Sequence, residues 1–201
     1  MAVKDVLLTV LRNKNTSTAE FRRASDKLSY ILCAEVIAKL ADRRVRVETP
    51  LDETDGLALP DDVMLVPVLR AAMAILPAFT DMLPDAPVGI VGVVRDEETA
   101  TPNLYYKKFP VELPRRAVII DPMLGTAGTS TLTAQLLIEE GIEPDNIHFA
   151  GVLAAPEGID RLAETIPHSN ITALAVDQDG LNAQYFITPG LGDYGDRYYG
   201  T

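Results

Sequence analysis

Five short apolar runs constrain the fold of this chain more than any other feature of its sequence. Each run has the length of a β-strand and is nearly continuous in Val, Ile, Leu or Ala, with little alternation between apolar and polar residues. Runs of this kind are typical of strands that are covered on both faces. They lie at residues 63–69, 88–94, 117–120, 147–153 and 171–176.

Helical segments are predicted between these runs. Candidate helices occupy residues 71–83, 130–140 and 158–164. A longer helix is predicted from Ser17 to about Leu40, because Ser17 and Glu20 have the spacing of a capping box and apolar residues then recur at helical intervals. Residues 45–61 are polar and predict a short strand with a loop. Strands that alternate with helices indicate an α/β fold, an open parallel sheet flanked by helices.

The length and charge of the chain limit how many domains it can form and which partners it can bind. Its 201 residues allow one domain with a sizeable core, and we expect residues 1–201 to form it. With 18 Lys+Arg against 29 Asp+Glu, the net charge is −11, which argues against a nucleic-acid partner. The single cysteine, Cys33, excludes an internal disulfide framework. No run of residues predicts a membrane span or a signal peptide, so we expect a cytoplasmic protein without membrane contact.

Charged or small residues follow four of the predicted strands. Arg70 follows the first run, Arg95 the second and Asp121 the third, while residues 154–158 follow the fourth. In an open parallel sheet, ligands bind at the carboxyl ends of the strands. The sequence therefore predicts that these residues lie along one rim.

The loop after the third run has the composition of a phosphate-binding site. Gly125 and Gly128 allow backbone amides to approach an anion closely. Thr126, Thr129 and Ser130 add hydroxyl donors, and the following helix adds the positive end of its dipole. The loop contains no Lys, so it is not the GxxxxGK[ST] nucleotide loop. A site for a phosphate monoester is the favoured interpretation, and a plain strand–turn–helix connection is the alternative.

Asp121 stands where the third run ends. Its carboxylate could accept hydrogen bonds from sugar hydroxyls, and it could stabilise positive charge that develops at a ribose carbon in a transition state. The alternative is an ordinary loop aspartate that caps a turn.

Residues 190–195 match the GxGxxG pattern of dinucleotide-binding proteins, but their context is wrong. Pro189 precedes them, and residues 196–201 are too few for the helix and second strand of a βαβ unit. We expect these glycines to present a backbone surface to a flat ligand instead.

Six segments, in order along nearly the whole chain, resemble those of uracil phosphoribosyltransferases. The segments are VPVLRA at 66–71, VRDEET at 94–99, VIIDPMLGTAGT at 118–129, AAPEG at 154–158, GLN at 180–182 and ITPGLGDYGDR at 187–197. The DPML and PGLGD sequences are the most specific of them. The resemblance implies a type I phosphoribosyltransferase fold with a small hood or flap over the active site.

The same resemblance implies a reaction and roles for individual residues. Members of this family use Mg²⁺ and transfer the phosphoribosyl group of 5-phospho-α-D-ribose 1-diphosphate to uracil, which gives UMP and diphosphate. The residues implied to bind the phosphoribosyl diphosphate are Arg70, Arg95, Asp121, Pro122, Met123, Leu124, Gly125, Thr126, Ala127, Gly128, Thr129 and Asp193. Those implied to line the uracil pocket are Ile187, Gly192, Asp193 and Tyr194. Arg70, Arg95, Asp121 and Asp193 are the expected catalytic residues, and no side chain is assigned to the metal.

The chemistry of these residues agrees with the implied roles. Arg70 and Arg95 suit a leaving diphosphate, because a guanidinium pairs with phosphate oxygens as a fork. Each arginine could instead belong to a structural ion pair. Backbone groups in 190–195 can pair with the amide-like edges of uracil, and they disfavour cytosine, whose amino group reverses the donor and acceptor pattern.

Several positions depart from the family pattern. Ala72 and Ala127 stand where the family generally has Gly, and Gly125 stands where it usually has Ala. Tyr194 replaces a residue that is commonly small, so its side chain is expected to point away from the base or to form a wall of the pocket.

Alternative functions remain open at this stage. A non-catalytic regulatory relative that senses a nucleotide would keep the fold, and an enzyme for a purine or orotate would keep a phosphate loop. The intact residues Arg70, Arg95, Asp121 and Asp193 favour the uracil enzyme of pyrimidine salvage. Some family members respond to GTP and form dimers or tetramers, so a GTP activator and a homo-oligomer are further expectations. Residues 105–108 have the pattern of an edge strand of the hood, and an ordinary exposed strand is the alternative.

Overall fold

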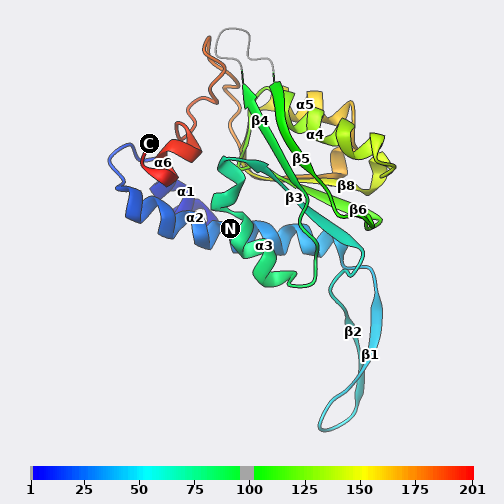
Figure 1. Cartoon of the computed structure of the whole chain (residues 1–201). Coiled ribbons are helices and arrows are strands. Elements are labelled where there is room, and N and C mark those ends of the chain that lie inside the picture. The colour runs from blue at the N-terminus through cyan, green and yellow to red at the C-terminus, as the bar shows by residue number, and fades with distance from the viewer. Residues whose placement is uncertain (1, 96–101) are drawn as a thin grey trace.

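Within residues 2–95 and 102–201, which the computed structural model describes, a seven-stranded sheet with helices on both faces forms the body of the protein (Figure 1). The strands are β3 (Val63–Leu69), β4 (Ile90–Arg95), β5 (Pro102–Lys108), β6 (Arg116–Ile120), β7 (Met123–Leu124), β8 (Ile147–Ala154) and β9 (Ile171–Val176). Their order is β5-β4-β3-β6-β8-β9, and β7 continues β6 along the same side of β8.

The predicted parallel sheet is confirmed, with one antiparallel strand at its edge. Strands β3, β4, β6, β7, β8 and β9 pair in parallel, whereas β5 is antiparallel to β4. The edge strand expected at residues 105–108 is therefore present, but it belongs to the main sheet and not to a hood. A Cβ on Gly92 would lie 2.6 Å from the ring of Tyr105, so the missing side chain lets that ring pack across the strand pair.

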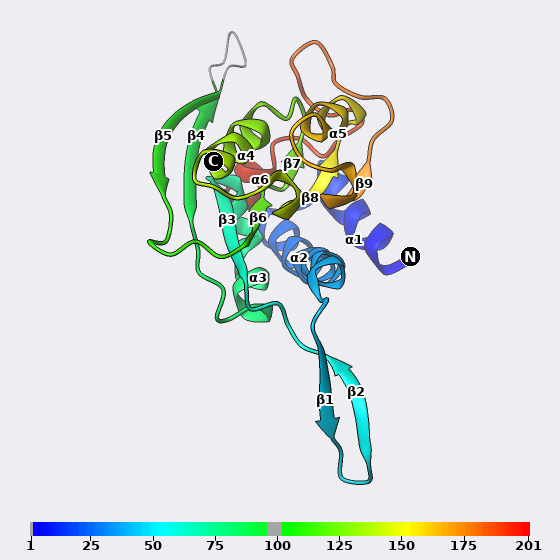
Figure 2. The same ribbon diagram turned by 90° about the vertical axis from the view of Figure 1, so that its right-hand side faces the viewer.

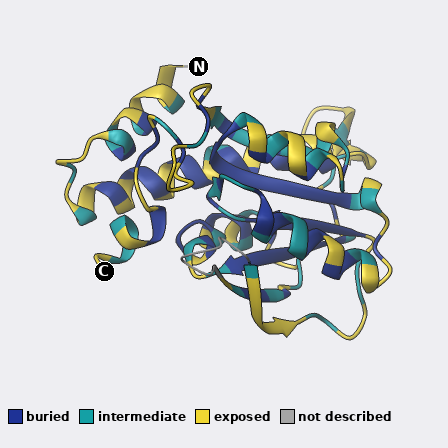
Figure 3. Ribbon diagram, turned by 90° about the horizontal axis from the view of Figure 1, so that it is seen from above, coloured by how far each residue is buried: buried dark blue, intermediate teal, exposed yellow. Residues whose placement is uncertain are grey.

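The continuous apolar runs are explained by two cores, one on each face of the sheet. In β3, Val63 and Leu65 face one core, and Met64 and Val66 face the other. The first core contains α1 (Ala2–Arg12), α2 (Thr18–Leu40) and α3 (Leu76–Met82), and the second contains α4 (Gly128–Glu139) and α5 (Pro156–Ala163). Figure 3 shows the buried strands between helices whose outer surfaces are exposed. Both sides of each central strand are thus removed from water.

Most of the helices agree with the predictions. The capping box of α2 is confirmed, since Ser17 accepts from Glu20 N and Glu20 accepts from Ser17 N. Helix α1 was not predicted. The single helix expected at 71–83 is divided into a 3-10 turn (Ala71–Ala74) and α3, because Pro77 has no N–H to continue a helix and lies in the first turn of α3. The small helix α6 (Tyr194–Tyr199) lies near the C-terminus.

A β-hairpin projects from the body of the molecule (Figure 2). Strands β1 (Arg44–Glu48) and β2 (Glu53–Leu57) pair antiparallel, so the expectation of a single strand with a loop in 45–61 was wrong. Nearly all of their residues are exposed, and Arg46 pairs across the hairpin with Glu53 and Asp55. With no face packed on the core, this segment lacks the apolar periodicity from which strands are recognised.

None of the helices in the described part of the chain is long and apolar enough to cross a membrane.

His148 makes the stability of this fold depend on pH. The side chain is buried at the start of β8, its Nδ1 has no hydrogen-bond partner among the described residues, and burial lowers its pKa to about 4. As the pH falls, His148 is therefore protonated below about pH 6.5 in the unfolded chain. In the folded chain it is protonated only below about pH 4. We expect the free energy of unfolding to fall by about 2 kcal/mol between about pH 7.5 and about pH 5. Urea unfolding of wild type and His148→Gln checks this, and an equal loss in both proteins would contradict it.

Candidate active site

The carboxyl ends of the parallel strands meet at one rim, and a cavity of about 720 Å³ opens there. Its lining residues are Ala71, Asp121, Met123, Gly125, Ala183, Gln184, Tyr185, Phe186, Ile187, Gly192, Asp193, Tyr194 and Gly195. Seven of them were predicted as site residues from the sequence: Asp121, Met123, Gly125, Ile187, Gly192, Asp193 and Tyr194. Two regions far apart in the sequence, residues 121–125 and residues 183–195, thus form one site together with Ala71. We call residues 121–129 the phosphate loop, residues 180–187 the hood loop, and residues 188–201 the tail.

The phosphate loop leads from β6 to the N-terminus of α4. The Asp121 carboxylate accepts a hydrogen bond from Met123 N at 3.3 Å, and Thr126 Oγ1 accepts one from Gly128 N at 3.5 Å. Gly128 and Thr129 already belong to α4, two residues earlier than the predicted start of the helix at 130. The first amides of a helix are not used within it, so those of α4 that follow Gly128 can donate to an anion at this end of the loop.

The departures from the family pattern in this loop have different structural consequences. Ala127 has φ 58° and ψ 4°, a left-handed conformation that costs a residue with a Cβ about 1–2 kcal/mol and costs Gly nothing. This explains why Gly suits the position. A Cβ on Gly125 would lie 3.6 Å from Leu181 and 3.9 Å from Ile187, which is ordinary contact, so Ala also fits there. Ala72 is buried in the 3-10 turn at ordinary negative φ and requires no glycine.

Not every predicted side chain faces the cavity. Pro122, Leu124 and Ala127 are buried, and Leu124 and Ala127 pack in the core beneath α4, so these residues can meet a ligand only through their backbone. Thr126 and Thr129 are half-buried.

Arg70 lies beside the cavity and pairs with the tail. Its Nη2 is 3.0 Å from Asp196 Oδ1, and its guanidinium lies over the ring of Tyr199. The side chains of Arg70 and Asp196 are 59% and 52% exposed, and an ion pair this exposed contributes about 0–1 kcal/mol. The structural ion pair considered as an alternative is therefore present, and it is weak enough to be exchanged for a phosphate.

Arg95 ends β4, where its backbone pairs with Pro102 of β5. Its side chain, and residues 96–99 of the segment that resembles the family, lie outside the described residues.

The tail is fixed by an ion pair that the sequence analysis did not find. Asp177, directly after β9, is buried, and its Oδ2 accepts from Gly190 N and from Arg12 Nη1, each at 2.8 Å. Arg12 also donates to Gly190 O at 2.9 Å. The hydrogen bond from Arg12 lowers the pKa of Asp177. Gly190 has φ 66°, and a Cβ there would lie 2.1 Å from the carbonyl oxygen of Ile187, so this turn requires glycine.

The side chain of Tyr194 is buried against α2. It is 1% exposed, its hydroxyl lies 2.7 Å from Ser25 Oγ, and its ring packs edge-on against Phe21. Burial raises the pKa of this phenol. This packing agrees with the first of the two expectations for Tyr194, although the residue also lines the cavity, and it anchors the tail on α2. Asp193 precedes it as the N-cap of α6, where its carboxylate accepts from Asp196 N at 2.8 Å.

The hood loop contributes lining residues that the sequence analysis missed. Tyr185 and Phe186 are each 50% exposed at the mouth of the cavity, next to Gln184. Asn182 shapes this loop, because its Oδ1 accepts from the backbone amides of Gln184 and Phe186. An exposed aromatic pair in a loop was the only available signal, and it is not specific to a site.

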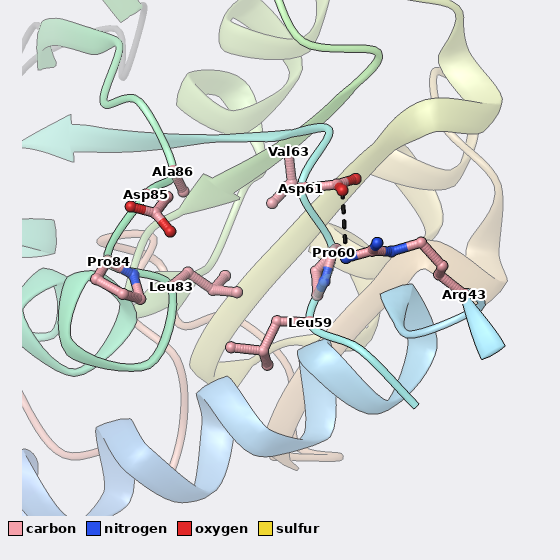
Figure 4. A pocket seen from close by; sticks show the side chains of 9 residues that line it. All are labelled: Arg43, Leu59, Pro60, Asp61, Val63, Leu83, Pro84, Asp85 and Ala86. Carbon is pink, nitrogen blue, oxygen red and sulfur yellow. Dashed lines mark ion pairs between the residues drawn. The ribbon is translucent and has the colours of Figure 1, made fainter. Parts of the chain in front are cut away.

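A second hollow, of about 280 Å³, lies at the root of the hairpin (Figure 4). It is lined by Arg43, Leu59, Pro60, Asp61, Val63, Leu83, Pro84, Asp85 and Ala86, and Arg43 and Asp61 form an ion pair there. Val63 begins β3, so this hollow lies at the amino ends of the strands, opposite the rim where ligands bind in such sheets. None of the predicted site residues lines it.

Comparisons with known proteins agree with the resemblance. A family model described as uracil phosphoribosyltransferase matches residues 2–201. The uracil phosphoribosyltransferase of Campylobacter concisus is 40% identical over 195 residues, which cover 96% of this chain and 92% of that protein.

Solved structures give the same fold. A protein from Aquifex aeolicus superposes with a TM-score of 0.83 at 30% identity, covering 98% of this chain and 94% of that one. A hypoxanthine phosphoribosyltransferase from Staphylococcus aureus superposes with a TM-score of 0.50 at 10% identity, covering 82% of this chain and 80% of that one. The second likeness shows the fold alone, a type I phosphoribosyltransferase fold.

Proposed function

The chain belongs to the uracil phosphoribosyltransferase family, and on this basis we propose that it transfers the phosphoribosyl group of 5-phospho-α-D-ribose 1-diphosphate to uracil, with UMP and diphosphate as products. The family match over residues 2–201 favours this enzyme over a non-catalytic regulatory relative.

One observation carries the proposal: the phosphate loop and the tail line the same cavity. Asp121, Met123 and Gly125 come from one side, and Gly192, Asp193 and Gly195 come from the other. A cavity of about 720 Å³ lies within the range of about 300–1,000 Å³ that is usual for small-molecule sites. The donor of the phosphoribosyl group and a flat base can therefore be held against each other, as the transfer requires.

In the reaction that we propose, the bond between C1 of the ribose and the diphosphate oxygen breaks, and a bond from C1 to N1 of uracil forms. The N1 proton of uracil passes to solvent water, and diphosphate leaves with the bonding electron pair. Positive charge develops at the ribose, and the carboxylate of Asp121, which lines the cavity, stabilises it in this proposal. Arg70 and Arg95 stabilise the leaving diphosphate, and backbone groups of Gly192 and Asp193 pair with the edge of uracil.

The carboxylates at the cavity suit Mg²⁺ as the metal. Oxygen ligands are those that Mg²⁺ prefers, and it usually takes one or two carboxylates together with phosphates of the substrate. Asp121 and Asp193 line the cavity, and the described residues contain no group of three acidic, His or Cys side chains that could hold a metal by themselves. Asp193 would supply the protein's carboxylate ligand, while Asp121 serves the ribose. When bound, Mg²⁺ neutralises charge on the diphosphate.

The proposal is tested by incubating the purified protein with radiolabelled uracil, phosphoribosyl diphosphate and Mg²⁺. We expect labelled UMP from uracil, and no nucleotide when hypoxanthine or orotate replaces it. Omission of phosphoribosyl diphosphate is the control. A folded protein that makes no UMP under these conditions would overturn the proposal.

Four further expectations rest on family membership alone: a role in pyrimidine salvage, a cytoplasmic location, GTP as an activator, and assembly as a dimer or tetramer. Initial rates with and without GTP test the activator, and sedimentation at several protein concentrations tests the assembly.

A further inference from the structure

The first turn of α5 lies directly against the phosphate loop. A Cβ on Gly158 would be 2.2 Å from the carbonyl oxygen of Gly125 and 2.7 Å from that of Leu124, closer than real side chains come to a backbone. Ala155 N donates to Leu124 O at 2.9 Å, and Arg161 Nη1 donates to Thr126 O at 3.2 Å. The absence of a side chain at residue 158 thus sets the distance between α5 and the loop.

The neighbouring residue contacts the hood loop. Glu157 Oε1 accepts a hydrogen bond from Leu181 N at 3.3 Å. A Cβ on Gly180 would lie 2.3 Å from the same oxygen, so the backbone of the hood loop passes directly over the carboxylate. The loop then turns back through Tyr185 and Phe186 to the cavity. This contact joins the first turn of α5 to the start of the hood loop.

Two consecutive residues of α5 therefore touch both loops, and neither of them lines the cavity. We propose that Gly158 and Glu157 are positioning residues for the two substrates: Gly158 places the phosphate loop, and Glu157 places the hood loop over the base. This inference rests on the proposed function. It assigns each residue to a different substrate, which a purely structural role would not do.

The test measures KM and equilibrium binding for each substrate separately. Gly158→Ala forces the Gly125 carbonyl to move, and we expect kcat/KM for phosphoribosyl diphosphate to fall about 10- to 100-fold, as misplacement on the scale of 1 Å does. Glu157→Ala removes one hydrogen bond from the hood loop, and we expect the KM for uracil to rise about 3- to 10-fold. Glu157→Gln keeps an oxygen acceptor for Leu181 N and is expected to restore the uracil KM.

Asp160→Ala, an exposed position on the same helix, is the matched control and is expected to leave both constants unchanged. Calorimetric titration measures the affinity for phosphoribosyl diphosphate without turnover. A thermal melt of each variant checks that it is folded. If Gly158→Ala does not fold, the comparison of Glu157→Ala with Glu157→Gln tests the inference by itself.

The outcomes separate this inference from the proposed function. The inference is supported if Gly158→Ala changes the constants for phosphoribosyl diphosphate and Glu157→Ala changes the KM for uracil. Wild-type constants in both variants, or an equal rise for both substrates without rescue by Glu157→Gln, would overturn it. If the wild-type protein makes no UMP, the proposed function itself is contradicted. If the wild type is active but the two variants do not differ in which substrate they affect, only the inference is contradicted.

Discussion

Replacement of Asp121 by Asn is expected to lower kcat by about 100-fold or more while the melting temperature changes little. Asn keeps the shape of the side chain and an oxygen that can accept from Met123 N, so this hydrogen bond within the loop is kept. What disappears is the negative charge at the cavity. Removal of one electrostatic partner of a transition state typically costs about 10²–10³ in rate. Steady-state kinetics at saturating substrates measures the loss.

Asp160→Asn removes one negative charge from an exposed position on α5 and controls for net charge. A circular-dichroism melt of each variant checks the fold. If Asp121→Asn turned over at the wild-type rate, Asp121 would have no part in stabilising the ribose.

Replacement of Asp177 by Ala is expected to lower the free energy of unfolding by about 2–3 kcal/mol. The change leaves Arg12 without its buried partner and Gly190 N without an acceptor, and loss of one partner of a buried pair costs about 3–5 kcal/mol. The expected value is smaller because the Arg12 side chain is 30% exposed and can recover part of its hydration. Urea unfolding at neutral pH measures the difference.

The same pair predicts a dependence on pH with a definite sign. The folded-state pKa of Asp177 is lowered, chiefly by the Arg12 hydrogen bond, so the unfolded chain binds its proton first as the pH falls. Stability from this pair is complete above the unfolded pKa of about 3.9 and is lost below it, as the pH passes through the lowered folded value. A double-mutant cycle with Arg12→Ala isolates the pair. A coupling energy near zero would mean that Arg12 and Asp177 act independently.

The sequence predicted the sheet because its strands are buried on both faces, which leaves a continuous apolar signal. It also predicted α2, because Ser17 and Glu20 are only three residues apart in the chain and their pairing needs only local geometry. The hairpin was misjudged for the opposite reason: its strands are stabilised by cross-strand pairs such as Arg46 with Glu53, and no core imposes a pattern on them.

For the site, the sequence predicted which segments matter and could not predict how they are held. The phosphate loop is a local motif, and its glycines and threonines are contiguous. Arg12 and Asp177 are separated by 165 residues, and nothing in the sequence around either one indicates the other. Tyr194 was expected to point away from the base or to form a wall, and only its packing against Phe21 and Ser25 decides between them. Contacts of this kind join distant segments through tertiary packing, so they produce no periodic pattern in the sequence.

The division of the sheet into two cores has a consequence for how this protein can change over time. Leu65 and Val118 are paired neighbours on one face, while Val66 and Ile119, the next residues along, form the corresponding pair on the other. A gain of volume at one residue can be compensated by its neighbour on the same face, but not by the residue that precedes it in the chain. The residues of the two cores can therefore change independently during evolution, and residues adjacent in the chain need not co-evolve.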